Sequence, residues 1–362
     1  MDSEFHRIGK DLSDVSWFHG DFVAQEENLR RVQKMTEENY ARGPYRDVCI
    51  LCSSSLSGET FFERGKITYI FCGNCGHVNG NRLLSKDFVE STYKGAEAAD
   101  DEVDGVYSRE FTTGKMALEY REVVERIYGP KSDFLKEYVL SRNLTVEDLA
   151  ILDFGCGSGH FMNALMTSGF RDVSGVDTFG PAIAAAVSIG GLNPSKIREV
   201  DPGETLEILG STQVDLVSMM CVLVHLESIG DAVAAMFENK SIRYSYQKIP
   251  MWSLATILES ALPEFRARVL GSDHTNVFTM DSLTWLENRF GLSRVASWTF
   301  GGDALDLQRK VLASLSRGQA SDGFISRVQS DLELLANPVQ HVIDSHSLSS
   351  EIHLIWEFPT RR

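Results

Sequence analysis

Residues 151–159 read ILDFGCGSG, and this stretch decides the fold. Its glycines, Gly155, Gly157 and Gly159, separate a short apolar run from a helix-compatible segment that begins at residue 160, and a second short run, VSGVD, ends at Asp177. A glycine-rich turn between a strand and a helix, with a carboxylate at the tip of the next strand, typically holds the adenosine part of a cofactor. The sequence therefore predicts a nucleotide-type cofactor here, with an ordinary strand-to-helix connection as the alternative.

The glycine spacing narrows the choice of cofactor. Turns that bind a dinucleotide pyrophosphate have the pattern G-x-G-x-x-G, whereas Asp153 and the three glycines form D-x-G-x-G-x-G. This pattern resembles motif I of the class I S-adenosylmethionine (SAM)-dependent methyltransferases. The resemblance implies that the turn, with Cys156 inside it, contacts the methionine and ribose parts of SAM. It also implies that Asp153 helps to bind the amino end and that Asp177 accepts hydrogen bonds from both ribose hydroxyls.

The charge and composition of the chain exclude several classes of function. The 362 residues suffice for about two domains, and the net charge is −16, from 35 basic and 51 acidic residues. A nucleic-acid-binding protein needs clustered Lys and Arg, so we expect no nucleic-acid partner. The N-terminus lacks the apolar core of a signal peptide, and no apolar run approaches the roughly 18 residues of a membrane span. We therefore expect a cytoplasmic protein without a membrane partner.

Four of the six cysteines have the spacing of a zinc site. Cys49, Cys52, Cys72 and Cys75 form C-x2-C-x19-C-x2-C, in which two tight turns each present two thiolates to one tetrahedral Zn²⁺. Because all four ligand positions are filled by sulfur, the predicted zinc is structural rather than hydrolytic. A disulfide pair or free thiols are the alternatives, and disulfides are rare in the cytosol. The neighbouring His77 could replace one thiolate as a ligand, but it is expected to be a surface residue.

The order of predicted elements indicates four segments. Strands alternate with helices after residue 146, which predicts an α/β fold with a parallel sheet covered on both faces. The last two strands would complete the seven-stranded, Rossmann-like sheet of SAM methyltransferases with its antiparallel edge. The segments are an N-terminal helical segment (1–45), a zinc-binding module (46–95), a helical linker (96–145) and a SAM-dependent methyltransferase domain (146–362). A helical insertion at about 302–350 would cover the active site or form a homodimer contact.

Two further segments extend the resemblance over nearly the whole chain. Residues 222–226 read VLVHL and residues 274–279 read HTNVFT. Together with the zinc module and motif I, they resemble bacterial methyltransferases of sugar and polysaccharide biosynthesis, some of which methylate nucleotide-linked sugars at carbon or oxygen. The resemblance implies a small-molecule acceptor of this kind. Val224 stands where that family commonly has a glutamate, so a glutamate-assisted mechanism is not carried over.

The sulfonium of SAM is already a good electrophile, so the enzyme need not activate the methyl group. It mainly needs a base for the acceptor. An acceptor hydroxyl or activated carbon must lose a proton, and histidine has a suitable pKa. His225 follows the fourth predicted strand at the carboxyl edge of the sheet, where ligands bind in such folds. His274 follows the fifth predicted strand and its helix. Both are candidate catalytic residues, and the alternative for each is a structural histidine.

Two other functions remain open from the sequence. Some ribosomal RNA methyltransferases carry a four-ligand zinc module in front of a SAM fold, but residues 41–100 hold as many acidic as basic residues, which disfavours RNA. A noncatalytic zinc-bearing protein that has kept the fold but lost SAM is the second alternative. The intact glycines and Asp177 argue against it.

Overall fold

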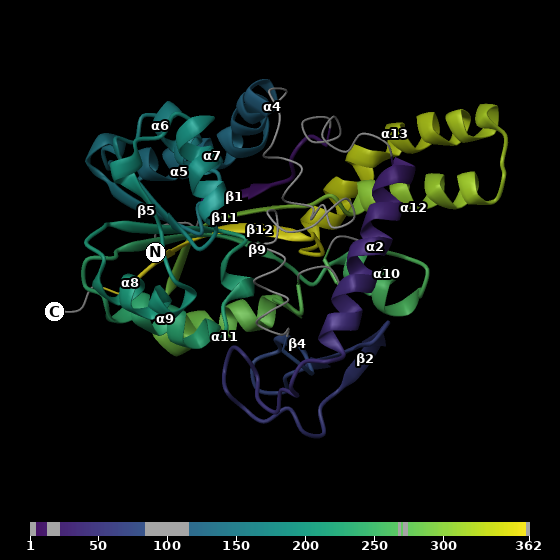
Figure 1. The fold of residues 1–362 in the computed structure, drawn as a ribbon, viewed down its shortest axis with the longest axis horizontal. Helices are drawn as coiled ribbons and strands as arrows, with labels where there is room; N and C mark the ends of the chain where they lie inside the picture. Colours follow the sequence, from purple (N-terminus) through teal and green to yellow (C-terminus); the bar gives the residue numbers. More distant parts are fainter. Residues whose placement is uncertain (1–4, 13–21, 84–115, 267–268, 271–273, 360–362) are drawn as a thin grey trace.

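A single mixed sheet forms the centre of the molecule in the computed structural model, which describes residues 5–12, 22–83, 116–266, 269–270 and 274–359 (Figure 1). Its eight strands have the order β1-β11-β12-β9-β8-β5-β6-β7. Their bounds are β1 (Phe5–Ile8), β5 (Ala150–Phe154), β6 (Asp172–Asp177), β7 (Ile197–Glu199), β8 (Leu216–Met220), β9 (Tyr244–Pro250), β11 (Ser293–Phe300) and β12 (Glu351–Glu357). The strands from β7 to β9 are parallel, and β12 is antiparallel to both β9 and β11.

Seven of these strands confirm the predicted sheet with its antiparallel edge, and β1 is an eighth strand that was not predicted. It pairs in parallel with β11, with Phe5 opposite Ala296. Its N-terminal position falls in the segment predicted to be helical. The ring of Phe5 packs 5.6 Å from that of Phe134, and the Trp298 indole donates a hydrogen bond of 2.8 Å to the Gly9 carbonyl. The N-terminus is thus held to the sheet edge by both apolar and polar contacts.

Helices cover both faces of the sheet, as the burial of its parallel strands requires. One face is covered by α5 (Gly129–Ser141), α6 (His160–Thr167) and α7 (Gly180–Ser188), whose apolar side chains share one buried cluster. The opposite face is covered by α8 (Thr205–Ser211), α9 (Ile229–Glu238) and α11 (Met280–Phe290), which share another. Before α5 lie α4 (Met116–Val123) and a π-helical turn, η4 (Val124–Tyr128). The carboxyl ends of β5, β6 and β8 therefore emerge between two helical layers.

The cysteine module is joined to the rest of the chain by a small second sheet. Its strands are β2 (Phe61–Arg64), β3 (Ile67–Phe71), β4 (Val78–Gly80) and β10 (Asn276–Val277), in the order β10-β4-β3-β2. Strand β10 comes from the segment just before α11. Cys49, Cys72 and Cys75 also belong to the same buried cluster as Leu223 and Phe278. The module predicted at 46–95 therefore shares its core with the residues that follow β8 and β9.

The segment between β11 and β12 is helical, as predicted, and it forms a hairpin of two helices. It consists of α12 (Asp303–Arg317) and α13 (Asp322–Ser345), and α12 packs against α2 (Phe22–Tyr40) and α10 (Leu254–Ala261). Glu26 of α2 is fully buried, and its carboxylate lies 3.6 Å from Arg309 Nε and 3.5 Å from Lys310 Nζ of α12. Among the helices of the described ranges, none is both long and apolar enough to span a bilayer.

Candidate cofactor, histidine and zinc sites

The glycine turn joins β5 to α6 and has the backbone geometry that only glycine adopts without strain. Gly155, Gly157 and Gly159 have φ angles of +74°, +51° and +75°. A Cβ on Gly155 would lie 2.3 Å from Val222 Cγ2, and one on Gly159 would lie 2.3 Å from Leu192 Cδ1. At Gly157, in contrast, a Cβ would meet no atom within 4 Å. Two glycines thus permit close packing, while the third leaves backbone uncovered for a ligand.

Asp177 ends β6 beside this turn, where the sequence predicted a cofactor-binding carboxylate. Its Oδ2 accepts a 2.7 Å hydrogen bond from the Gly157 amide, and its Oδ1 accepts one of 2.9 Å from the Phe179 amide. Burial raises the pKa of Asp177, and these amide donors oppose that rise. Each carboxylate oxygen keeps a second lone-pair direction for a further donor. Asp177 therefore also shapes the turn, a role that the sequence analysis did not predict.

Asp153 lies below the turn on β5 and is only 1% exposed. Its Oδ1 accepts a 2.7 Å hydrogen bond from the Ser218 hydroxyl of β8. Burial raises the pKa of Asp153 to about 7, although the Ser218 hydrogen bond lowers it. The carboxyl is therefore balanced between its neutral and charged forms near neutral pH. A cation nearby would favour the charged form.

An aromatic stack that the sequence analysis did not predict packs beside the turn. The ring of His160, the first residue of α6, lies between those of Tyr120 and Tyr128, with centroid distances of 4.2 and 5.6 Å. Its Nδ1 lies 2.9 Å from the Ser158 hydroxyl. Burial lowers the pKa of His160 to about 4, so the ring is neutral at physiological pH. The Tyr120 hydroxyl donates to the Ser158 carbonyl at 3.0 Å, which fixes the preceding helices to the turn.

The two predicted catalytic histidines lie together although 49 positions separate them in the sequence. His225 ends the short 3-10 helix η8 (Leu223–His225) that follows β8, and His274 precedes β10. Their rings stack with centroids 5.0 Å apart and an angle of 27° between planes. His225 is exposed and His274 is half-buried. The pair is thus partly accessible at the carboxyl edge of the sheet.

The four predicted zinc ligands also lie together. Their sulfur atoms are all within 4.8 Å of one another, with Cys49 and Cys75 3.6 Å apart and Cys52 and Cys72 3.5 Å apart. Four sulfurs around one zinc at about 2.3 Å would be separated by about 3.8 Å, so the cluster has the size of a tetrahedral thiolate site. The Leu51 amide and the Asn79 side chain each lie 3.4 Å from Cys49 Sγ as donors. All six cysteines are free of disulfides.

The prediction that His77 lies on the surface is wrong. Its side chain is fully buried, its Nε2 lies 3.0 Å from Asn276 Oδ1, and its ring meets that of Phe278 edge-on at 4.7 Å. Burial lowers the pKa of His77 to about 4. Asn276 also donates a 2.7 Å hydrogen bond to the Val224 carbonyl, next to His225. A polar path therefore connects the cysteine module to the turn that carries the candidate base.

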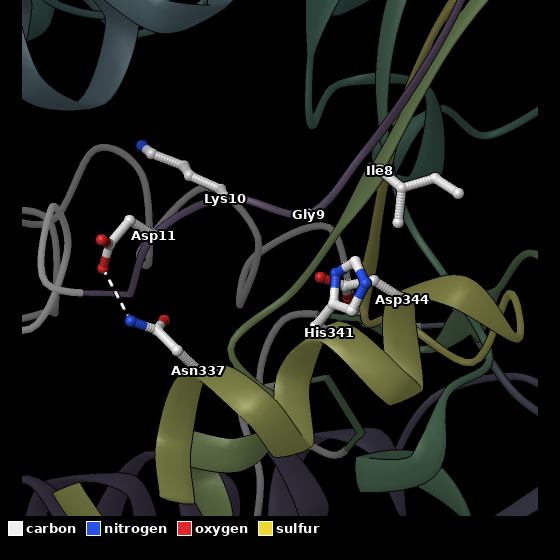
Figure 2. Close-up of a pocket in the computed structure, with 7 residues that line it drawn as sticks. All are labelled: Ile8, Gly9, Lys10, Asp11, Asn337, His341 and Asp344. Atoms are coloured by element: carbon white, nitrogen blue, oxygen red, sulfur yellow. Dashed lines mark hydrogen bonds between the residues drawn. The ribbon is translucent and has the colours of Figure 1, made fainter. Parts of the chain in front are cut away.

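A hollow of about 370 Å³ between the N-terminal segment and α13 shares no residue with these sites. Figure 2 shows its lining, in which the Asn337 side chain donates a 2.9 Å hydrogen bond to Asp11. It is lined by Ile8, Gly9, Lys10, Asp11, Asn337, His341 and Asp344. None of the cofactor, histidine or cysteine residues predicted from the sequence lies there.

Comparison with known proteins identifies the domain. Residues 120–297 match the family model described as "Methyltransferase domain". A SAM-dependent methyltransferase structure from Archaeoglobus fulgidus is 17% identical, with a TM-score of 0.39, and the match covers 66% of this chain and 98% of that one. Magnesium protoporphyrin IX methyltransferase from Synechocystis with bound SAH is 15% identical, with a TM-score of 0.39 and coverages of 59% and 92%. No curated protein sequence matches the chain.

The family match spans the elements that carry the site. It begins at Tyr120 of the aromatic stack and ends within β11, so it includes the glycine turn, Asp177 and both histidines. The strand order and the D-x-G-x-G-x-G turn agree with it. Residues 120–297 therefore form a class I SAM-dependent methyltransferase domain, and the protein is a SAM-dependent methyltransferase.

Proposed function

We propose that the enzyme methylates a small molecule, specifically a nucleotide-linked sugar or a related biosynthetic metabolite, with His225 or His274 as the general base. The observation that carries this proposal is the stacking of the two histidine rings, 5.0 Å apart, after β8 and before β10. The sugar class is supported by the resemblance of residues 222–226 and 274–279 to sugar methyltransferases. The net charge of −16 disfavours the RNA alternative.

When bound, SAM supplies a methyl group on a positively charged sulfur. The uncovered backbone at Gly157 and the carboxylate of Asp177 would hold its methionine and ribose parts, while Asp153 would face its amino end. The protein's remaining task is to align the acceptor and remove its proton. A histidine ring nitrogen would take that proton, and the second ring of the stack would restrict the rotation of the first.

Further proposals concern the metal, the location and the assembly. We propose that the four cysteines bind one structural Zn²⁺, because their sulfurs form a compact cluster of the correct size. The absence of disulfides among the six cysteines supports a reducing, cytoplasmic location. A homodimer contact through α13 is supported by its exposed apolar side chains, Phe324, Leu334 and Leu335.

Replacing the base is expected to lower kcat by about 10²- to 10⁴-fold, the usual contribution of general base catalysis. His225→Gln and His274→Gln would be compared by steady-state kinetics, with SAM affinity measured by calorimetry. Whichever histidine acts as the base should show this loss with SAM affinity unchanged. His346→Gln, at an exposed position just after the end of α13, is the control. Full activity in both site variants would rule out a histidine base.

Assigning the acceptor requires a direct assay of methyl transfer. Candidate nucleotide sugars would be incubated with the enzyme and isotopically labelled SAM, and the products would be analysed by mass spectrometry. A labelled methyl group on a nucleotide sugar would support the proposal. Labelling of ribosomal RNA instead would favour the zinc-module RNA methyltransferase.

The affinity for SAM is expected to increase as the pH rises from about 6 to 8. The pKa of Asp153 is raised to about 7 in the free protein, so the carboxyl is protonated below that pH. The cationic amino end of SAM favours the ionised form, so binding should release a proton near pH 7. By the same linkage, the free enzyme should lose stability as the pH rises from 3.8, the ordinary value for this group, to about 7. Calorimetry in two buffers of different ionisation enthalpy measures the proton release.

The isosteric variant Asp153→Asn provides the control for this pH dependence. It cannot ionise, so its SAM affinity should be nearly constant over the same pH range. A pH dependence that persists unchanged in the variant would assign the titration to another group.

A further inference from the structure

A group of charged side chains lies at the carboxyl edge of the sheet and includes none of the predicted cofactor, histidine or zinc residues. Lys248 is near the end of β9, and Glu351 begins the antiparallel β12, which brings both to this edge. Lys248 Nζ lies 2.8 Å from Glu351 Oε2, and His353 Nε2 lies 2.8 Å from Glu351 Oε1. The Tyr246 hydroxyl lies 2.9 Å from the other nitrogen of His353. Glu351 is therefore fully engaged by its neighbours.

Lys131 of α5 adds a second ammonium to this group. Its side chain is only 4% exposed. Among the described residues its ammonium donates no hydrogen bond, and it lies 4.8 Å from the centroid of the Tyr128 ring. Burial, and then the charge of Lys248, lower the pKa of Lys131 to about 7. The Glu351 carboxylate acts on Lys131 through its charge, but a buried ammonium that donates no hydrogen bond is costly, which indicates that a ligand supplies an acceptor.

The charges of the group do not balance. Lys131 and Lys248 supply two positive charges against the single carboxylate of Glu351. Burial opposes ionisation of that carboxyl, but Lys248 and Lys131 hold its pKa well below the usual value. Burial also lowers the pKa of His353 to about 4 and raises that of the Cys221 thiol, so both are neutral. With Lys131 ionised, one positive charge is left without a counterpart.

This excess charge adjoins both parts of the methyl-transfer site. The Tyr128 ring that contacts Lys131 also stacks on His160 beside the glycine turn. On the other side, the Cys221 amide donates a 3.0 Å hydrogen bond to the Lys248 carbonyl. Cys221 has a φ of +64° and begins the short segment that leads to His225. A ligand group held here would thus be close to both the cofactor turn and the histidine pair.

We propose that Lys131 and Lys248 bind an anionic oxygen group, a phosphate or a carboxylate, of the methyl acceptor. This inference rests on the proposed function, because it assigns a charge to the acceptor of that reaction. The diphosphate of a nucleotide-linked sugar has the required chemistry. Glu351, held by Lys248 and His353, would limit the site to one net positive charge and fix the direction of the Lys248 ammonium.

Calorimetric titration of inorganic pyrophosphate into enzyme saturated with SAH, the demethylated cofactor, tests the proposal. Lys131→Met should weaken pyrophosphate binding by at least about tenfold, because it removes the unpaired charge. Lys136→Met, on the same helix, should stay within about twofold of the wild type. Failure of the wild type to bind pyrophosphate, or equal binding by Lys131→Met, would overturn the proposal.

A second, nearly isosteric variant increases the positive charge of the group instead of decreasing it. Glu351→Gln raises the net positive charge of the group by one, so pyrophosphate should bind several-fold more tightly. Unchanged or weaker binding would count against the proposal, even if Lys131→Met fails to fold.

The affinity of Lys131→Met for SAH distinguishes whether the anionic group belongs to the acceptor or to the cofactor. Unchanged SAH affinity assigns the anion to the acceptor, as proposed. A tenfold loss of SAH affinity would instead assign it to the carboxylate of the cofactor and overturn the acceptor assignment. The proposed function fails separately, if no nucleotide sugar receives a labelled methyl group while pyrophosphate still binds through Lys131.

Discussion

Replacing Asp177 by alanine is expected to lower the affinity for SAM by roughly tenfold to a hundredfold. The estimate corresponds to about 1.5 to 3 kcal/mol for lost hydrogen bonds to a charged acceptor. The structure adds a second reason, because the same carboxylate accepts hydrogen bonds from the Gly157 and Phe179 amides. The variant would lose both the proposed contact with the ribose and the support of the glycine turn. Isothermal titration with SAM measures the affinity directly.

Two control variants separate these effects. Asp177→Asn keeps one acceptor oxygen and should show an intermediate loss. Asp172→Ala, at the start of the same strand, removes an exposed carboxylate paired with Lys196 and should leave the affinity unchanged. Equal SAM affinity in Asp177→Ala and the wild type would contradict the cofactor assignment at this turn.

The parts of the fold that the sequence predicted are those whose signal is local. Apolar runs with turn residues between them gave the seven strands, and the D-x-G-x-G-x-G pattern located the turn, because its glycines need positive φ angles within a few residues. The insertion between the last two strands was predicted as helical because its signal is also local. The cysteine cluster was also predictable from the sequence, because two closely spaced pairs suffice to form one four-sulfur site.

The features that the sequence did not reveal depend on partners far away in the chain. Phe5–Ile8 is too short to be recognised as a strand, and it is stabilised by pairing with β11 almost 300 residues later. His77 is polar and was expected at the surface, but Asn276, 199 positions away, satisfies it in the core. The Lys131 group draws its residues from α5, β9 and β12. No local sequence pattern identifies these long-range contacts, because each side chain taken alone is compatible with an exposed position.

The zinc site is expected to have the largest effect on stability. Purified protein should contain about one zinc per chain, and Cys75→Ser should lose the metal and several kcal/mol of stability, because metal binding supplies folding free energy in such modules. The cysteines share their buried cluster with Leu223 and Phe278 of the catalytic part. Loss of zinc should therefore also disturb the His77–Asn276–Val224 path that supports His225. Metal analysis and thermal unfolding measure the two effects.

Cys221→Ala is the matched control, because Cys221 lies outside the four-sulfur cluster. It should keep its zinc. If the path through Asn276 carries the coupling, a strong chelator should abolish methyl transfer before it lowers SAM affinity, since the glycine turn lies between β5 and α6 and takes no part in the His77–Asn276–Val224 path. Zinc-free wild-type protein with normal stability and activity would show that the four cysteines are merely free thiols packed in a core.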